Sequence, residues 1–114
     1  MSNTVVGNYL RAHRRRRGLS QRDLGLLAGY NNAWQVSRHE RSKTAPPLLV
    51  ALAYGVIFRV PVAELFAGFQ SAVTDSVARN LEELKADLES PTRGRRRAKV
   101  TSQTLQWLTE RRSR

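Results

Sequence analysis

The 114-residue chain contains no cysteine, which excludes disulfides and thiolate metal sites. It also has no apolar run near the roughly 18 residues that a membrane-spanning helix needs. Its first apolar stretch precedes a cluster of positive charge, which is the reverse of the order in a secretory signal peptide. Together these absences favour a cytoplasmic protein without a membrane segment.

Residue patterns typical of catalysis are also missing. The two histidines, His13 and His39, have no acidic or cysteine partner at a metal-binding spacing, and we expect His39 to be a partly buried packing residue. Neither a P-loop nor a GxSxG motif occurs. The adjacent Glu82 and Glu83 are expected on a solvated helix face. We therefore expect no enzyme activity, no cofactor and no metal.

Acidic residues are few: nine Asp and Glu stand against 20 Lys and Arg, giving a net charge of +11. Such an excess predicts a polyanionic partner or an anionic membrane surface. Residues 1–69 hold 10 basic and 3 acidic residues, residues 70–90 hold 2 and 5, and residues 91–114 hold 8 and 1. This pattern predicts a domain at 1–69, an amphipathic helix within 70–90, and a basic, partly helical tail at 91–114.

The periodicity of apolar residues predicts an all-α fold. Five short helices are expected in the first segment, at residues 8–17, 20–28, 32–41, 48–58 and 62–66. Gly68 is expected to close the fifth helix. The helix at 48–58 is apolar almost all round, so we expect it to be the most buried.

The segment from Ser20 to Arg41 has the order of a helix-turn-helix. Ser20 and Asp23 have the spacing of a capping box at the start of the second helix. Gly29 permits a sharp turn after it, and Asn31 or Asn32 can cap the third helix.

The phase of the third helix separates its supports from its candidate reading residues. With Val36 facing the core, steps of about 100° per residue turn Glu40 inward and Trp34 and Arg38 outward. Arginine and glutamine suit the edges of guanine and adenine. The expected base-reading residues are Asn32, Trp34, Gln35, Ser37 and Arg38. The alternative is that this outward face is only solvated.

The stretches LSQRDLGLLAGY and VSRHERSKTAPP resemble the phage-repressor and Cro-like regulators of the Xre family, over about residues 8–66. This resemblance implies a five-helix repressor-like DNA-binding domain, whose third helix enters the major groove of double-stranded DNA. It also implies a phosphate contact at Gln21 and an ion pair between Arg14 and Glu40.

The chain departs from the family pattern at three places. One extra residue lies between Gly29 and Val36, within YNNAWQ, which leaves the register of base contacts open there. Gly25 stands where alanine is usual, and Ser42 replaces a loop glycine.

Contacts with the DNA backbone are expected from the basic cluster at the end of the first helix, from the start of the second helix and from the two ends of the third helix. These residues are Arg15, Arg16, Arg17, Gln21, Asn31, Arg41, Ser42 and Lys43. Phosphate contacts supply affinity and salt dependence rather than sequence choice. The alternative is again a solvated basic surface.

A stripe of apolar residues in steps of three and four runs through residues 71–89. Its members are Val73, Val77, Leu81, Leu84 and Leu88. Two interpretations stay open: the stripe packs on the chain's own five-helix core, or it forms a homodimer seam. The arginine-rich linker at 90–99 precedes a last helix expected at 100–114. The tail from Arg93 is a second candidate for nucleic-acid contact.

These patterns predict a sequence-specific transcriptional regulator, a dimeric repressor of an inverted-repeat operator. Two alternatives belong to other classes of function. One is an antitoxin-like regulator that also binds a protein partner through its C-terminal helices. The other is a basic protein that coats RNA or DNA without sequence preference.

Overall fold

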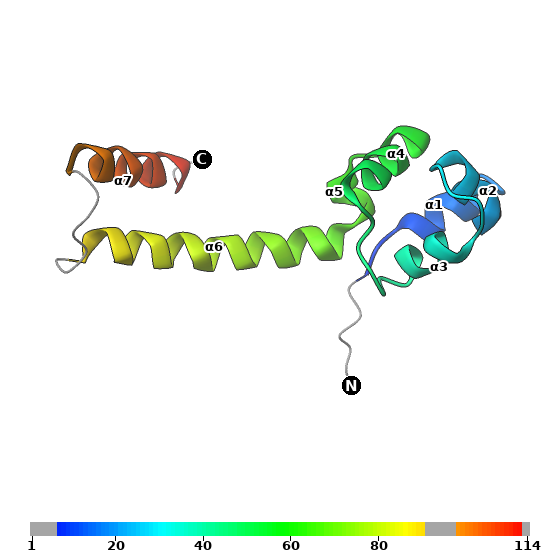
Figure 1. The fold of residues 1–114 in the computed structure, drawn as a ribbon, viewed down its shortest axis with the longest axis horizontal. Helices are drawn as coiled ribbons and strands as arrows, with labels where there is room; N and C mark the ends of the chain where they lie inside the picture. The colour runs from blue at the N-terminus through cyan, green and yellow to red at the C-terminus, as the bar shows by residue number, and fades with distance from the viewer. Residues whose placement is uncertain (1–6, 91–97, 113–114) are drawn as a thin grey trace. The chain divides into compact units, whose positions relative to one another are not determined.

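The computed structural model describes residues 7–90 and 98–112, which form seven α-helices and no strand, so the predicted all-α class is confirmed. The helices are α1 (Leu10–Arg16), α2 (Gln21–Leu27), α3 (Trp34–Glu40), α4 (Leu48–Phe58), α5 (Val62–Leu65), α6 (Ala67–Glu89) and α7 (Ala98–Arg112) (Figure 1). The chain divides into two compact units, one up to residue 72 and one from residue 73. None of the described helices is long and apolar enough to cross a membrane.

Four helix starts differ from the prediction by two residues or more. Helix α1 begins at Leu10 rather than at residue 8, α3 at Trp34 rather than near residue 32, α6 at Ala67 rather than at residue 71, and α7 at Ala98 rather than at residue 100. Gly68 therefore lies inside α6, where it costs only about 1 kcal/mol of helix propensity. Phe69 packs against the core of the first unit, which favours the earlier start of α6.

At the C-terminal end, α7 begins at Ala98, so two residues expected in the linker are helical. The predicted start of the nucleic-acid-binding tail at Arg93 and the rest of the predicted linker, residues 91–97, lie outside the described residues.

The core of the first unit joins all five of its short helices. Helix α3 packs against both α1 and α2, and α4 packs against α5 (Figure 1). The buried residues of this core are Leu10, Leu24, Val36, Tyr54, Phe58, Leu65 and Phe66. Its ends are tied together by hydrogen bonds from the Tyr9 N–H to the Leu65 carbonyl, 2.8 Å, and from the Gly68 N–H to the Gly7 carbonyl, 3.1 Å.

Helix α4 corrects one prediction: it is not the most buried helix. Only Ala51, Tyr54 and Phe58 are buried, and they lie on the side that meets the core. The other face of α4 is exposed, although it is equally apolar. A helix is buried all round only when neighbours cover every face, and four other short helices do not supply that cover in this unit.

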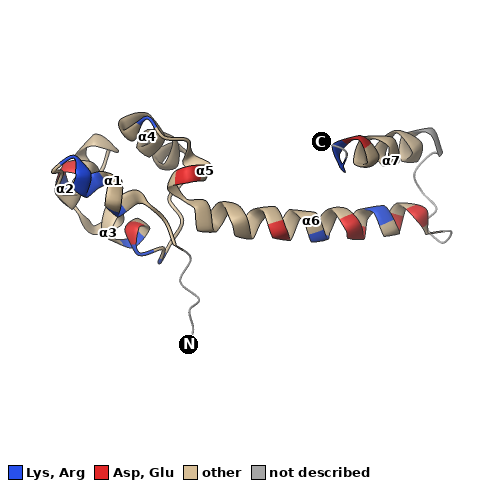
Figure 2. Ribbon diagram, turned by 180° about the vertical axis from the view of Figure 1, so that it is seen from behind, with Lys and Arg blue, Asp and Glu red and all other residues tan. Residues whose placement is uncertain are grey.

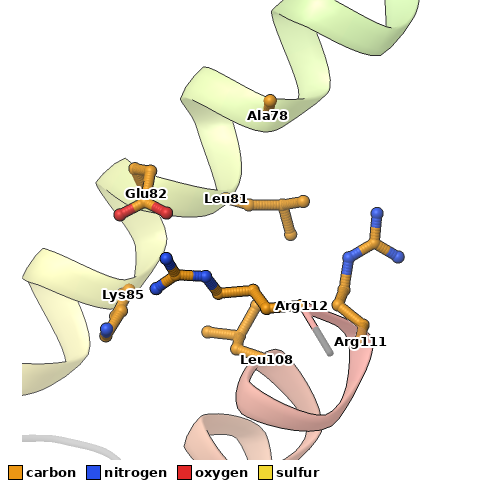
Figure 3. Close-up of a pocket in the computed structure, with 7 residues that line it drawn as sticks. All are labelled: Ala78, Leu81, Glu82, Lys85, Leu108, Arg111 and Arg112. Carbon is orange, nitrogen blue, oxygen red and sulfur yellow. The ribbon is translucent and has the colours of Figure 1, made fainter. Parts of the chain in front are cut away.

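The second unit consists of α6 from Val73 onward together with α7. Leu88 of α6 and Leu108 of α7 are buried. Leu81 and Leu108 line a hollow of about 290 Å³ between the two helices, whose polar rim includes Glu82 and Arg112 (Figure 3). Leu81 of the α6 stripe thus lies opposite α7. The sequence had instead suggested the five-helix core or a second copy as the neighbour of this stripe.

The exposure of the other stripe residues decreases along α6. Val73 and Val77, at its start, are exposed, whereas Leu84 is half-buried. The apolar surface of α6 that is open to solvent is therefore concentrated in the first turns of the stripe.

Candidate nucleic-acid interface

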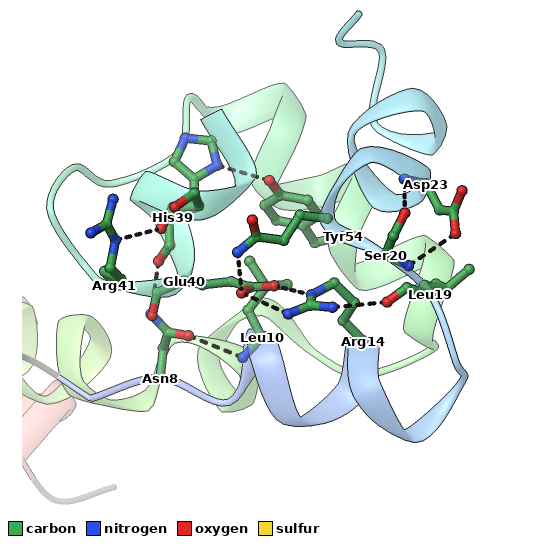
Figure 4. Close-up of polar contacts among 12 residues, drawn as sticks. Asn8, Leu10, Arg14, Leu19, Ser20, Asp23, His39, Glu40, Arg41 and Tyr54 are labelled. Carbon is green, nitrogen blue, oxygen red and sulfur yellow. Dashed lines mark hydrogen bonds and ion pairs between the residues drawn. The ribbon is translucent and has the colours of Figure 1, made fainter. Parts of the chain in front are cut away.

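Helix α2 starts with a complete capping box. The Ser20 Oγ accepts a hydrogen bond from the Asp23 N–H, and the Asp23 carboxylate accepts one from the Ser20 N–H, both at 2.9 Å (Figure 4). The hydrogen bonds from Ser20 lower the pKa of the Asp23 carboxyl. The predicted capping box is confirmed, and it fixes the first residue of α2 at Gln21.

The turn after α2 depends on two glycines. Gly29 has a φ of +99°, a left-handed conformation that favours glycine. At Gly25 a Cβ would lie only 2.5 Å from the Asn32 carbonyl oxygen. The backbone at Asn32 therefore occupies the space that a side chain at position 25 would need.

The start of α3 is set by Asn32. Its side-chain oxygen accepts a hydrogen bond from the Trp34 N–H at 2.9 Å, a local arrangement that asparagine often makes in turns. Asn31 and Asn32 are both exposed and precede the helix. Helix α3 therefore begins two residues after its approximate predicted start, with Ala33 rather than Asn31 or Asn32 as its N-cap residue, and both asparagines lie in the turn.

Glu40 holds α1, α2 and α3 together (Figure 4). Arg14 contacts its carboxylate through Nε and Nη2, the latter at 3.2 Å, and donates from Nη1 to the Leu19 carbonyl at 2.8 Å. Gln21 Nε2 donates to the same carboxylate at 3.1 Å. The structure thus places Arg14 and Glu40 in a bidentate ion pair, and it places the side chain of Gln21 in this network.

His39 connects α3 to α4. It is almost completely buried, more than the sequence suggested, and its Nδ1 lies 2.8 Å from the Tyr54 hydroxyl (Figure 4). Burial, with the nearby charge of Arg38, lowers the pKa of His39, and burial raises the pKa of Tyr54. Both groups are consequently neutral at pH 7, which allows them to stay inside the core.

The outward face of α3 presents Trp34 and Arg38. Val36 is fully buried while the Trp34 side chain is 61% exposed, so the predicted phase of this helix is confirmed. The Arg38 guanidinium carbon lies 5.7 Å from the centre of the indole ring, a cation–π contact. Among the described residues, no hydrogen bond uses the Arg38 guanidinium. Gln35 and Ser37 are half-buried beside this face.

The expected phosphate-binding residues lie at the ends of α1 and α3. Figure 2 marks positions of Lys and Arg in blue along the ribbon of α1, α2 and α3. Arg15 and Arg16 are exposed, whereas the Arg17 guanidinium stacks over the Phe58 ring at 5.7 Å. Beyond α3, Arg41 and Lys43 are also exposed.

Asn8 is a supporting residue that the sequence did not reveal. Its Nδ2 donates to the His39 carbonyl at 2.9 Å and to the Ser42 Oγ at 2.8 Å, while its Oδ1 accepts from the Leu10 N–H at 3.0 Å (Figure 4). It thereby joins the start of α1 to the end of α3. The hydrogen bond from Asn8 also holds Ser42 in place. Ser42 has a φ of +56°, a left-handed conformation that glycine adopts without strain. Its partners on α3 are more than 30 residues away, so no local pattern signals this role.

The first unit therefore fixes α3 from its inner side, and the outer side carries the exposed Trp34 and the half-buried Arg38. The functional roles inferred from the family resemblance remain predictions. Comparisons with models of protein families, with curated proteins and with solved structures found no match to this chain.

Proposed function

We propose that this chain is a transcriptional regulator that binds double-stranded DNA sequence-specifically, with α3 in the major groove. The observation that carries the proposal is the outward face of α3. Arg38 has a guanidinium without a hydrogen-bond partner in the described chain, held beside an exposed indole. The opposite side of α3 is held in place by the buried Val36 and His39 and by the ion pair of Glu40.

The chemistry of this face suits base reading. The major groove is about 12 Å wide and admits one α-helix, and arginine binds guanine through two parallel hydrogen bonds. Stacking on Trp34 restricts the Arg38 side chain before it meets a ligand, which lowers the entropy lost on binding. In this arrangement Arg38 reads guanine, and Trp34, Gln35 and Ser37 contact neighbouring base pairs. Asn32 contacts the DNA from the turn rather than from the helix.

The surrounding charges supply the sequence-independent part of the affinity. Exposed arginines lie in the last turn of α1, and Arg41 and Lys43 follow α3. Gln21 engages Glu40 with one side-chain N–H, so its phosphate contact is assigned to its backbone N–H at the start of α2. We propose that the regulator acts as a homodimer on an inverted repeat, because two copies of α3 then meet two equivalent half-sites.

The test is a comparison of Arg38→Ala with the parent chain on duplexes enriched from random DNA and on scrambled duplexes of equal length. We expect Arg38→Ala to weaken binding to the enriched duplex by about 1–3 kcal/mol and to change binding to the scrambled duplex far less. Fluorescence anisotropy at fixed salt measures both affinities.

The matched control is Arg59→Ala, which removes an exposed arginine at the end of α4. It is expected to leave the ratio of the two affinities unchanged. An equal loss on both duplexes for Arg38→Ala would make Arg38 a phosphate contact and would contradict the proposed reading face.

A further inference from the structure

Two neighbouring side chains on the outer side of α3 differ sharply in chemistry. Trp34 and Arg38 are four residues apart, so they lie one turn apart on the same side of the helix. The Arg38 guanidinium carbon is 5.7 Å from the centre of the indole ring, and Trp34 is 61% exposed. Gln35 and Ser37, beside them, end in hydrogen-bonding groups. This side of α3 therefore presents one large apolar surface directly beside one cationic donor.

The indole of Trp34 loses its water when α3 enters the major groove, because base edges then face it. The base pairs show mainly hydrogen-bond donors and acceptors there, and the C5 methyl group of thymine is their one apolar group. An edge of donors and acceptors that an indole covers gives up water without gaining an equal number of hydrogen bonds. Thymine is therefore the base that Trp34 covers at the least cost in free energy.

The distance between Trp34 and Arg38 limits how far apart their base pairs lie. Successive bases along one strand of DNA are about 3.4 Å apart along the helix axis. The 5.7 Å between the guanidinium carbon and the ring centre is less than two such steps, so the two groups reach the same base pair or adjacent ones. A guanine–cytosine pair carries no methyl group. When Arg38 binds guanine, the adjacent base pair is therefore the one that Trp34 covers.

We propose that Trp34 and Arg38 together read one dinucleotide step, a guanine next to a thymine, with the indole over the C5 methyl group of the thymine. This inference rests on the proposed function and narrows its substrate. Arg38 donates to O6 and N7 of the guanine, and Trp34 selects the methylated pyrimidine beside it. Because 5-methylcytosine carries a methyl group at the same ring position, it fits this contact as well, whereas cytosine does not.

The experiment removes the methyl group and nothing else from the DNA. Duplexes that contain the motif enriched from random DNA are prepared with thymine or with uracil beside the guanine, and fluorescence anisotropy measures the affinity of the full chain for each. The parent chain is expected to bind the thymine duplex about fourfold more tightly, which is the effect of burying one CH₂ group. Trp34→Ala is expected to bind the two duplexes equally.

Cytosine at the same position gives an independent measurement. Duplexes with cytosine or 5-methylcytosine beside the guanine differ only in the methyl group, and both pyrimidines pair with guanine. The parent chain is expected to prefer the methylated duplex, again about fourfold. Trp34→Ala is expected to lose this preference, whereas Trp34→Phe, which keeps an aromatic ring, is expected to retain part of it. Low salt, equal for all chains, keeps the binding of weakened variants measurable.

The matched control is Trp107→Ala, in α7. Trp107 is 50% exposed, and the Arg111 guanidinium carbon lies 5.7 Å from the centre of its ring. The substitution therefore removes a tryptophan from the same local arrangement outside α3, and it is expected to leave both methyl preferences unchanged. Trp34 and Trp107 are both exposed, so the helical circular dichroism of both variants is expected to match that of the parent chain.

The outcomes separate this inference from the proposed function. A pool without an enriched motif would contradict the proposed function and the inference with it. An enriched motif whose guanine has no neighbouring thymine would leave sequence-specific binding intact but overturn the reading of this dinucleotide step. Equal affinity of the parent chain for the thymine and uracil duplexes, or an unchanged preference in Trp34→Ala, would also overturn it and leave Trp34 only as a support for the Arg38 side chain.

Discussion

At the scale of single residues, side chains with local partners were predictable and those with distant partners were not. The capping box of Ser20 and Asp23 spans three residues, so its spacing is visible in the sequence. Asn8 acts across more than 30 residues, and only the folded chain brings it to the end of α3. The absence of a Cβ at Gly25 also had no visible reason in the sequence, since that reason is the Asn32 carbonyl in a different segment.

The contact at Gly25 gives a prediction for stability. Gly25→Ala is expected to destabilise the fold by about 1–3 kcal/mol, because the added methyl group meets a backbone oxygen that has little room to move. This loss exceeds the gain of about 1 kcal/mol in helix propensity that alanine would otherwise bring. Urea unfolding measures the difference. Leu26→Ala, at an exposed position of the same helix, is the control and should change stability by less than about 0.5 kcal/mol. A Gly25→Ala chain as stable as the parent would contradict the close approach of the turn.

At the scale of elements, the number and order of the helices followed from the sequence, but the burial of α4 and four helix starts did not. Apolar periodicity and glycine or proline boundaries are properties of the helix itself, which is why the range of α4 was predicted correctly. The burial of α4 depends on its neighbours, and the exposed Leu48, Leu49 and Leu52 show that these neighbours cover one side only. Similarly, α6 extends to Ala67 because Phe69 contacts a core assembled from other helices.

The link between α3 and α4 predicts a loss of stability in acid. Because the fold lowers the pKa of His39, protonation favours the unfolded chain. Stability is expected to be constant above the unfolded histidine pKa of about 6.5 and to decrease as the pH falls below it. Urea unfolding at about pH 8 and about pH 5 measures this difference.

His39→Gln is the matched variant for that measurement, because glutamine keeps a hydrogen-bonding side chain but does not titrate. Its stability is expected to change less between the two pH values than that of the parent chain. The pKa of His13 is also lowered, by burial and by Arg16 and Arg17, so part of the pH dependence should remain. An equal pH dependence in His39→Gln and the parent chain would exclude His39 as its source.

At the scale of the whole molecule, net charge and the proposed homodimer contribute differently to DNA binding. The net charge of +11 supplies long-range attraction for any nucleic acid, whereas choice among sequences requires the outward face of α3. The proposed homodimer would present two copies of that reading face to the two halves of a site. Overall charge was available from the sequence alone, but the exposure of one side of α4 was visible only in the fold.

Salt dependence tests the electrostatic part of this account. Arg15→Ala is expected to weaken binding to enriched and scrambled duplexes alike and to reduce the salt slope by about one unit. Arg59→Ala removes the same charge at the end of α4 and is expected to leave the slope unchanged. Anisotropy titrations at several salt concentrations give both slopes, and an unchanged slope for Arg15→Ala would exclude this residue from the phosphate contacts.

The most direct test of sequence-specific binding is selection of duplexes from random DNA by the parent chain, followed by sequencing. The account predicts enrichment of an inverted repeat that contains guanine in each half-site, with half-sites about one turn of DNA apart, or a multiple of it. Recovery of a pool without any enriched motif, despite measurable binding, would contradict sequence-specific reading by α3 and would identify a basic protein that binds nucleic acid by charge.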